Sequence, residues 1–314
     1  MPPYEGGSGG CSRADVKGDR VNEALKEVLD LLDLEQIEED MFRGRSPEER
    51  IQRVFGGQVA AQALVAAGRT VPAGKNVHSL HAYFIRPGDP ARPIVYDVER
   101  VRDGRSFTTR RVVAIQHGKA IFTMSASFHV EEPGVEHQAS AMPVVPAPET
   151  LPTVQEQLLT LLDEDDERRE WVTRPRPVEA RYASPLTWEA HLDPSLRSAE
   201  TNVWFRYDAD LPDDPLLHVV LAAYASDYTL VDTVLLAHGL AWGTTDVMAA
   251  SLDHAMWFHR PFRADEWLLY AQESPWSGGA RGLARGEMFN ASGELVVSVV
   301  QEAMIRTRLS QNRR

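Results

Sequence analysis

Asp227 interrupts an apolar stretch of the chain in a way that suggests chemistry. Between residues 216 and 239 apolar side chains recur every three or four positions, which is typical of one helix face, and Gly239 is a natural end for that helix. A single helix would place the Asp227 carboxylate on the apolar face. Burial raises the pKa of a carboxyl towards the range that suits a general base. The alternative is a structural aspartate that bonds a backbone amide or marks a kink or cap.

Gln301 occupies a comparable position in a strand-like segment. Between residues 295 and 305 every second residue is apolar, and Gln301 falls on the apolar face. A buried primary amide must find hydrogen-bond partners. A reactive water and a carboxylate would supply them, and backbone groups would do so if the residue is only structural.

The histidines and the single cysteine do not form a metal-binding pattern. His254 and His259 are separated by an odd number of residues, as are His78 and His81, so within a strand each pair points to opposite faces. Cys11 is the only cysteine, which excludes an intrachain disulfide and any site built from several cysteines. We therefore expect no metal.

The composition is that of a soluble globular protein with an acidic surface. Of its 314 residues, 43% are hydrophobic and 25% are charged, and the net charge is −13. This charge argues against binding nucleic acid or an anionic membrane, because no surplus of Lys and Arg is available to neutralise phosphates. We see no apolar run of about eighteen residues and no secretory signal, so we expect no membrane span and a cytoplasmic location.

The N-terminal half predicts two helices followed by four strands. The first helix covers residues 21–32, and a second, Ala-rich helix covers about 58–67 and ends at Gly68. The strand-like segments that follow are separated by Gly and Pro, and they cover residues 77–85, 94–102, 106–116 and 119–130.

The C-terminal half repeats this order. Strands are expected at 178–182 and 201–206, then the helix at 216–239, then strands at 248–259, 266–274, 279–289 and 295–307. The segments SLHAYFIRPGDP and SLDHAMWFHRPF correspond, since Arg86-Pro87 and Arg260-Pro261 end them equivalently. Such a duplication implies two copies of one α+β unit, a helix on an antiparallel sheet. We expect the two units to join edge to edge, which covers edge strands that would otherwise be open.

These boundaries divide the chain into five parts. Residues 1–20 form a Gly/Ser-rich tail that should be disordered, 21–131 the first unit, and 177–308 the second unit with the candidate site. Residues 132–176 read as a linker with a short helix near 154–162 and a solvated charge run at 163–170. Residues 309–314 are a short second tail.

Several blocks of the chain resemble one known family, the bacterial TesB-like acyl-CoA thioesterase II family, to which peroxisomal acyl-CoA thioesterases are related. Over about residues 21–308 the matching blocks are, in order, FGGQVAAQAL, HSLHAYFIRPGDP, YDVERVRDGRSFTTRRV, AYASDYTL, SLDHAMWFHRPF, EWLLY and VSVVQEAM. The resemblance implies a double hotdog fold, that is, two tandem helix-plus-antiparallel-sheet units. It also implies hydrolysis of fatty acyl-CoA to free fatty acid and CoA, with no metal, no cofactor and no covalent intermediate.

The resemblance also implies a catalytic set. In the family an Asp, a Thr or Ser, and a Gln jointly hold and activate the attacking water, and by position these are Asp227, Ser251 and Gln301. Ser251 departs modestly from the Thr of the bacterial type member, but it keeps the hydroxyl that can orient water. In the N-terminal half the corresponding positions fall near Gln58 and Ala126, so only the C-terminal half is expected to carry the chemistry.

The substrate implies further candidates. Arginine pairs well with phosphate, so Arg86, Arg260, Arg281 and Arg285 are candidates for contacting the CoA phosphates, unless they are ordinary surface or interface residues. Because hotdog sheets commonly pair, we expect a homo-oligomer, a dimer or a tetramer of double hotdogs.

Two other functions remain possible on the same fold. A non-catalytic acyl-CoA-binding or regulatory hotdog protein would require the catalytic set to be broken, whereas all three residues are present. A hydratase or dehydratase would place a His with an Asp in the substrate tunnel, and we find no such motif. The preferred acyl chain length is not encoded in any pattern that we can identify.

Overall fold

The computed structural model describes residues 22–47, 53–243 and 247–307. Its strands form one antiparallel sheet of thirteen strands in the order β1-β2-β4-β5-β6-β3-β10-β13-β12-β11-β8-β7, with β9 paired to β13 beside this path. The predictions for Cys11, for both tails and for a helix start at Val21 lie outside the described residues.

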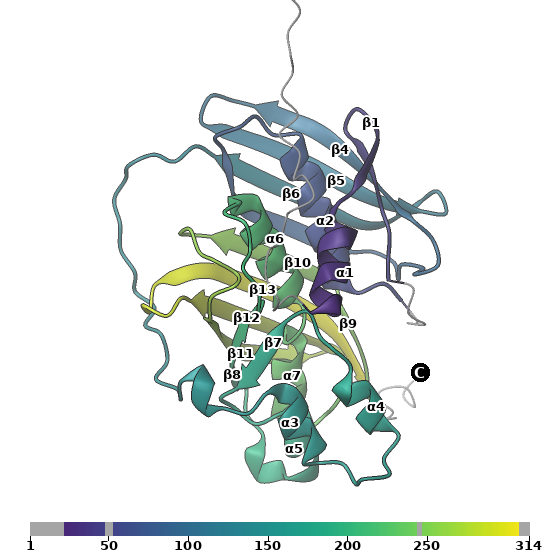
Figure 1. Cartoon of the computed structure of the whole chain (residues 1–314), viewed down its shortest axis with the longest axis vertical. Helices are drawn as coiled ribbons and strands as arrows, with labels where there is room; N and C mark the ends of the chain where they lie inside the picture. The colour runs from purple at the N-terminus through teal and green to yellow at the C-terminus, as the bar shows by residue number, and fades with distance from the viewer. Residues whose placement is uncertain (1–21, 48–52, 244–246, 308–314) are drawn as a thin grey trace, which may run out of the picture.

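The N-terminal half of the sheet packs on one helix (Figure 1). Helix α2 (Gly56–Arg69) contacts all five of the strands that cover it, and every residue from Gly57 to Ala67 is buried. Its glycines and alanines let the sheet and helix α6 approach closely. We expected α2 to end at Gly68, and it ends one residue later, at Arg69. The covering strands are β2 (Met41–Gly44), β3 (Asn76–Phe84), β4 (Ile94–Asp103), β5 (Phe107–Gln116) and β6 (Lys119–His129).

Two elements before α2 complete this half. Helix α1 (Glu23–Leu32) is capped by Asn22, whose side chain accepts the Leu25 N–H, and it buries Leu25, Val28, Leu31 and Leu32. Strand β1 (Glu35–Glu38) pairs with β2 at the sheet edge. Neither β1 nor β2 was predicted, because both are only four residues long and β1 is exposed throughout.

The C-terminal half repeats the arrangement, as the duplication predicts. Helix α7 (Leu230–His238) lies on β11 (Leu268–Gly278) and β12 (Arg281–Phe289). The neighbouring strands are β13 (Leu295–Thr307), β10 (Asp253–Phe258), β8 (Glu200–Arg206) and, at the edge, β7 (Glu179–Tyr182).

The two halves join through β3 and β10, which pair antiparallel with Leu80 opposite Met256. The predicted edge-to-edge contact is therefore confirmed. Arg86 and Arg260 follow the ends of these two strands at equivalent places, as expected.

The predicted strand 248–259 is divided in two. Strand β9 (Val247–Ser251) sets Ser251 opposite Ala303, whereas β10 sets Ala255 opposite Val300, so the register shifts by one residue between them. The Asp253 carboxylate accepts the Glu302 N–H at 2.7 Å within this irregularity. Such bulges bend a strand and turn nearby side chains in a new direction.

The predicted helix 216–239 is also divided, which corrects the expectation of one continuous helix. Helix α6 (Pro215–Ser226) ends at Asp227, and a short turn leads into α7. By length and composition alone the stretch Pro215–His238 could cross a membrane, but 78% of its most apolar window is buried inside the protein. Its apolar character is that of a core element.

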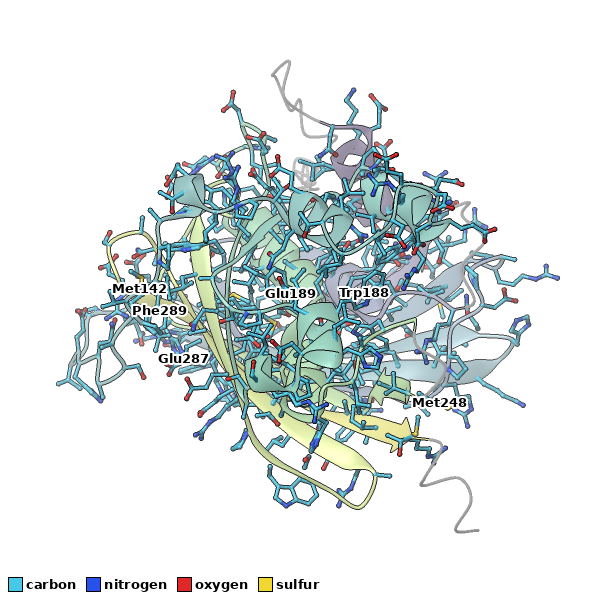
Figure 2. The ribbon with its side chains drawn as sticks, turned by 90° about the horizontal axis from the view of Figure 1, so that it is seen from below. Met142, Trp188, Glu189, Met248, Glu287 and Phe289 are labelled. Atoms are coloured by element: carbon cyan, nitrogen blue, oxygen red, sulfur yellow. The ribbon has the colours of Figure 1, made fainter. Side chains whose placement is uncertain are left out.

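The segment between the halves first crosses the outer face of the C-terminal sheet. Figure 2 shows Met142 beside Phe289, and the Trp204 indole donates to Pro146 O at 3.0 Å. The segment between the halves then forms the 3-10 helix η1 (Pro148–Thr150) and the helices α3 (Val154–Leu159) and α4 (Arg168–Thr173). After β7 come α5 (Thr187–Leu192) and η2 (Pro194–Leu196). We predicted α3 but neither α4, which begins within the charge run 163–170 and extends beyond it, nor α5.

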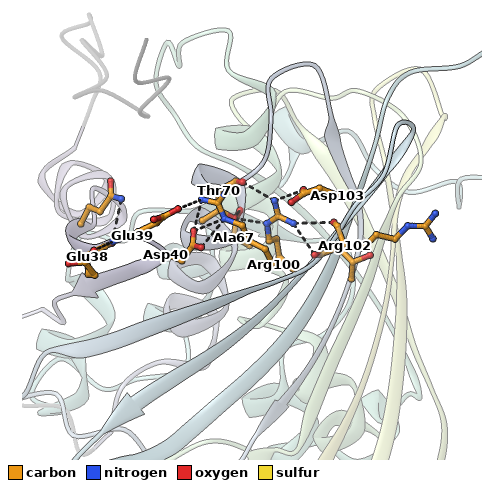
Figure 3. A network of polar contacts seen from close by, with 11 residues as sticks. Glu38, Glu39, Asp40, Ala67, Thr70, Arg100, Arg102 and Asp103 are labelled. Carbon is orange, nitrogen blue, oxygen red and sulfur yellow. Dashed lines mark hydrogen bonds and ion pairs between the residues drawn. The ribbon is translucent and has the colours of Figure 1, made fainter. Parts of the chain in front are cut away.

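A buried arginine ties the end of α2 to the sheet. Arg110 on β5 has a fully buried side chain, and its guanidinium donates to Thr70 O at 2.9 Å and to Asp103 Oδ1 at 2.6 Å. Thr70 is the C-terminal cap of α2, and Figure 3 shows Thr70 and Asp103 in this network. The contacts fix the position of α2, whose other end reaches the candidate site.

Candidate active site

Asp227 lies at the break between α6 and α7, and two predicted partners reach its carboxylate. The Gln301 Nε2 donates to Asp227 Oδ1 at 2.8 Å, and the Ser251 hydroxyl donates to the same oxygen at 3.3 Å. Asp227 itself caps α6 with helical backbone angles. The kink-or-cap interpretation is thus correct for its backbone, while its side chain takes part in a polar cluster.

Gln301 and Ser251 are positioned by strands on either side of a register shift. Gln301 is 1% exposed on β13, between the buried Val299 and Ala303, as the alternation predicted. Ser251 is the last residue of β9, directly before the irregularity that separates β9 from β10. The bend therefore occurs where the hydroxyl must turn towards Asp227.

The N-terminus of α2 supplies a further contact from the other half of the chain. The Gly57 N–H donates a hydrogen bond to the Asp227 carboxylate. The capping residue Phe55 provides no side-chain acceptor, so Asp227 takes that role. A Cβ on Gly56 would stand 2.6 Å from Asp227 Oδ2, which shows how closely the helix approaches.

The electrostatic balance favours a carboxylate that can accept a proton. Burial raises the pKa of Asp227, and four opposing effects lower it without cancelling the rise: the charge that His254 carries when it is protonated, the hydrogen bonds from Gln301 and Ser251, and the Gly57 N–H. A raised pKa brings a carboxylate closer to the working range of a general base.

His254 lies beside this cluster, and sequence reasoning missed it. Its side chain is 1% exposed, and its Nε2 lies 2.8 Å from the Ser226 hydroxyl. Burial lowers the pKa of His254, so the ring is neutral near pH 7. We considered this histidine only as a metal ligand, and the signal that could have revealed it is its place on the inward face of a strand next to Ser251.

Asp227 and Ser251 open onto a cavity of about 880 Å³. Most of its wall is apolar, including Val59, Phe84, Phe122, Val203, Phe205 and Tyr270. Gln301 does not line this cavity but reaches the carboxylate from behind. The space suits a long apolar group whose reacting end meets Asp227.

Only one of the four predicted arginines lies at the cavity. Arg86 lines it and donates to Ala120 O at 2.6 Å. The other three do not line it: Arg260 donates to Leu295 O at 2.9 Å, Arg281 pairs with Glu302 at 2.9 Å, and Arg285 pairs with Glu273, so a role for them at the CoA phosphates stays a prediction. Two arginines that we had not singled out, Arg53 and Arg176, do line the cavity.

The corresponding positions of the N-terminal half offer no such cluster. Ala126 is buried opposite Leu80 on β3, and Gln58 donates to Arg45 O at 3.0 Å. Within the described residues no three His, Cys, Asp or Glu side chains gather as metal ligands.

The chain belongs to the acyl-CoA thioesterase family. Residues 179–304 match the family profile described as acyl-CoA thioesterase, and residues 45–129 match the acyl-CoA thioesterase N-terminal domain. The chain is 41% identical to acyl-coenzyme A thioesterase 8 of Homo sapiens, over 97% of this chain and 95% of that protein. The resemblance recognised in the sequence is therefore confirmed.

Solved structures support the same fold. The acyl-CoA thioesterase II TesB2 from Mycobacterium marinum is 42% identical and matches with a TM-score of 0.72, covering 90% of this chain and 97% of that one. A protein of unknown function with a hot dog fold from Alicyclobacillus acidocaldarius matches with a TM-score of 0.71 at 21% identity, covering 90% of this chain and 98% of its own. With the duplicated helix-and-sheet unit, these matches confirm the α+β double hotdog.

Proposed function

We propose that this protein hydrolyses fatty acyl-CoA to free fatty acid and CoA, using water activated by Asp227, Ser251 and Gln301. The observation that carries the proposal is the meeting of these three side chains, from a helix end and two strands, with Asp227 and Ser251 at the wall of a largely apolar cavity. Membership of the acyl-CoA thioesterase family supports the substrate class.

In the proposed reaction Asp227 is the general base. The water oxygen attacks the thioester carbonyl carbon while the carboxylate takes the water proton. The tetrahedral intermediate then collapses, the carbon–sulfur bond breaks, and the departing thiolate receives that proton from Asp227. The products are a carboxylic acid and the CoA thiol, and the carboxylate is regenerated.

Ser251 and Gln301 have different roles in this scheme. Ser251 lines the cavity, so its hydroxyl can hold the water at the carboxylate. Gln301 donates to Asp227 from behind and keeps the carboxylate oriented. The first-turn N–H groups of α2 that Asp227 does not cap lie nearby and are suited to the developing oxyanion.

The role of Ser251 is tested by substitution, because a serine next to a carboxylate is also a conceivable nucleophile. If it only orients water, Ser251→Thr keeps most activity and Ser251→Ala retains a measurable fraction. If it forms an acyl-enzyme, Ser251→Ala loses all activity above background. Mass spectrometry of the parent protein during turnover provides the second readout, since a trapped acyl adduct on Ser251 would contradict activation of water.

The proposal extends to the oligomeric state of the protein and to its location in the cell. We propose a homo-oligomer, a dimer or a tetramer, which sedimentation velocity tests directly. We also propose that the protein acts in the cytoplasm.

A further inference from the structure

A second carboxylate faces the same cavity and has no part in the proposed reaction. Asp232 lies in the first turn of α7 and lines the cavity together with Tyr182, Leu186 and Trp188. Trp188 lies on the short helix α5, and Figure 2 labels it beside Glu189 of the same helix. Asp227 and Asp232 lie on either side of the turn between α6 and α7, and both line the cavity. A substrate that reaches Asp227 can therefore extend past Asp232.

The carboxylate of Asp232 has a single hydrogen-bond donor among the described residues. The Trp242 indole N–H donates to its Oδ1, and the Trp188 indole in turn donates to Trp242 O at 3.1 Å. No arginine or lysine of the described chain pairs with Asp232. Burial raises its pKa to about 7, so a substantial fraction is ionised at neutral pH.

A carboxylate in such a wall with one hydrogen bond and no cation partner from the described residues is unfavourable unless a further partner arrives. The second oxygen of the ionised carboxylate, Oδ2, is an acceptor that suits a hydroxyl or an amide N–H. A plain saturated acyl chain offers neither group. A hydroxyl on the acyl chain offers one, and so do the amides of the pantetheine arm of CoA.

We propose that Asp232, held by Trp242, forms a polar subsite that binds a hydrogen-bond-donating group of the substrate, either a hydroxyl on the acyl chain or an amide of the pantetheine arm. This inference rests on the proposed thioesterase function. It assigns Asp232 a role in substrate selection and leaves the chemical step to Asp227.

The test compares three thioesters of one chain length: dodecanoyl-CoA, a hydroxydodecanoyl-CoA, and the dodecanoyl thioester of mercaptoethanesulfonate, which has no amide. KM and kcat are measured for the parent, for Asp232→Leu and for Asp232→Asn. The Asn variant keeps the side-chain shape and an acceptor for Trp242, but it turns a donor towards the incoming group. It therefore keeps the test valid if the Leu variant does not fold.

A hydroxyl on the acyl chain and an amide of the pantetheine arm predict different changes in KM. If the acyl hydroxyl binds here, KM for hydroxydodecanoyl-CoA rises about tenfold more than KM for dodecanoyl-CoA in both variants. If the pantetheine arm binds here, KM rises about equally for the two CoA thioesters and much less for the mercaptoethanesulfonate thioester. In either case the parent's advantage for the preferred substrate grows as the pH rises through about 7, where Asp232 ionises, and the Asn variant lacks this dependence.

A uniform change for all three thioesters, or no change for any, would overturn the subsite, because a purely structural Asp232 cannot distinguish them. The proposed function is judged separately from the parent protein alone. If the parent releases no thiol from dodecanoyl-CoA, the thioesterase assignment fails, whatever Asp232 does.

Discussion

The Gln301 amide donates to Asp227 Oδ1 over 2.8 Å, although 74 residues separate the two along the chain. A carboxylate only accepts, so the amide must present its nitrogen to Asp227 and turn its oxygen away. That buried oxygen and Nδ1 of the buried His254 make no hydrogen bond of ordinary geometry among the described residues, but the two side chains do interact, and the Gln301 amide raises the pKa of His254. The Gln301 side chain therefore interacts with both Asp227 and His254.

Replacing Gln301 by Leu should move the acidic limb of the pH–activity profile to higher pH. The hydrogen bond from Gln301 lowers the pKa of Asp227, so its loss raises that pKa further. A base acts only when deprotonated, and activity is then lost at a higher pH as the medium is acidified. The profile of kcat/KM against pH measures this shift. The matched control is Gln116→Leu, another buried amide, which bonds only backbone groups around Asp89 and Arg92 and should leave the limb in place.

Gly56→Ala should lower kcat without removing any polar group. The added Cβ would stand 2.6 Å from Asp227 Oδ2 and 2.9 Å from the Phe84 ring, so the carboxylate must move. We expect kcat to fall at least tenfold, because small displacements of catalytic groups are costly. Gly68→Ala, at the other end of α2, meets only the flexible end of Leu216 and should retain activity. Equal activity of the two variants would argue against a site at the α2 N-terminus.

Asp227→Asn should make the protein more stable at alkaline pH. The folded state raises the pKa of Asp227, so it holds this proton to a higher pH than the unfolded state does. The protonated Asp227 carboxyl therefore contributes fully to stability at pH values below its ordinary pKa. That contribution is lost as the pH rises through the raised pKa of the folded state. A neutral Asn avoids that loss. Thermal unfolding should give the variant a higher Tm than the parent at pH 8 and a smaller difference near about pH 4. A parent that is more stable than the variant at pH 8 would contradict the assigned burial.

Arg110→Leu should destabilise the fold by about 3 kcal/mol, because removing one member of a buried polar network leaves its partners unsatisfied. The neighbouring Arg111 provides the control. Its side chain is 58% exposed and pairs with Glu99 at 3.0 Å, so Arg111→Leu should change the free energy of unfolding by less than about 1 kcal/mol. Urea denaturation of both variants measures the difference. Similar losses for the two would show that the Arg110 contacts to Thr70 and Asp103 are not important for stability.

The sequence allowed most of the fold to be predicted, because long strands with regular alternation and a duplicated motif are strong signals. The short strand β1 and the helices α4 and α5 were missed because their stability comes from contacts with distant parts of the chain, such as the packing of Val172 and Leu186 in one cluster. The helix break at Asp227 was hidden for a related reason. Apolar periodicity continues across it, since α6 and α7 are both buried.

The site was predictable in part. Gln301 is detectable as a polar residue on an apolar strand face, and Asp227 as a carboxylate in an apolar stretch. No local pattern indicates that the Gly57 N–H from the other unit completes the cluster, or that Arg53 and Arg176 reach the cavity. Those contacts depend on how the two halves pack, which pairing between β3 and β10 determines.

The most direct test of the central claim is thiol release from a panel of acyl-CoAs of increasing chain length, with the parent and Asp227→Asn side by side. The account predicts release by the parent and a loss of about a thousandfold in kcat for the variant, which keeps its fold. The panel also supplies the chain-length preference. Turnover by Asp227→Asn at the parent rate would contradict the assignment of Asp227 as the base. No release by the parent from any acyl-CoA would contradict the thioesterase function itself.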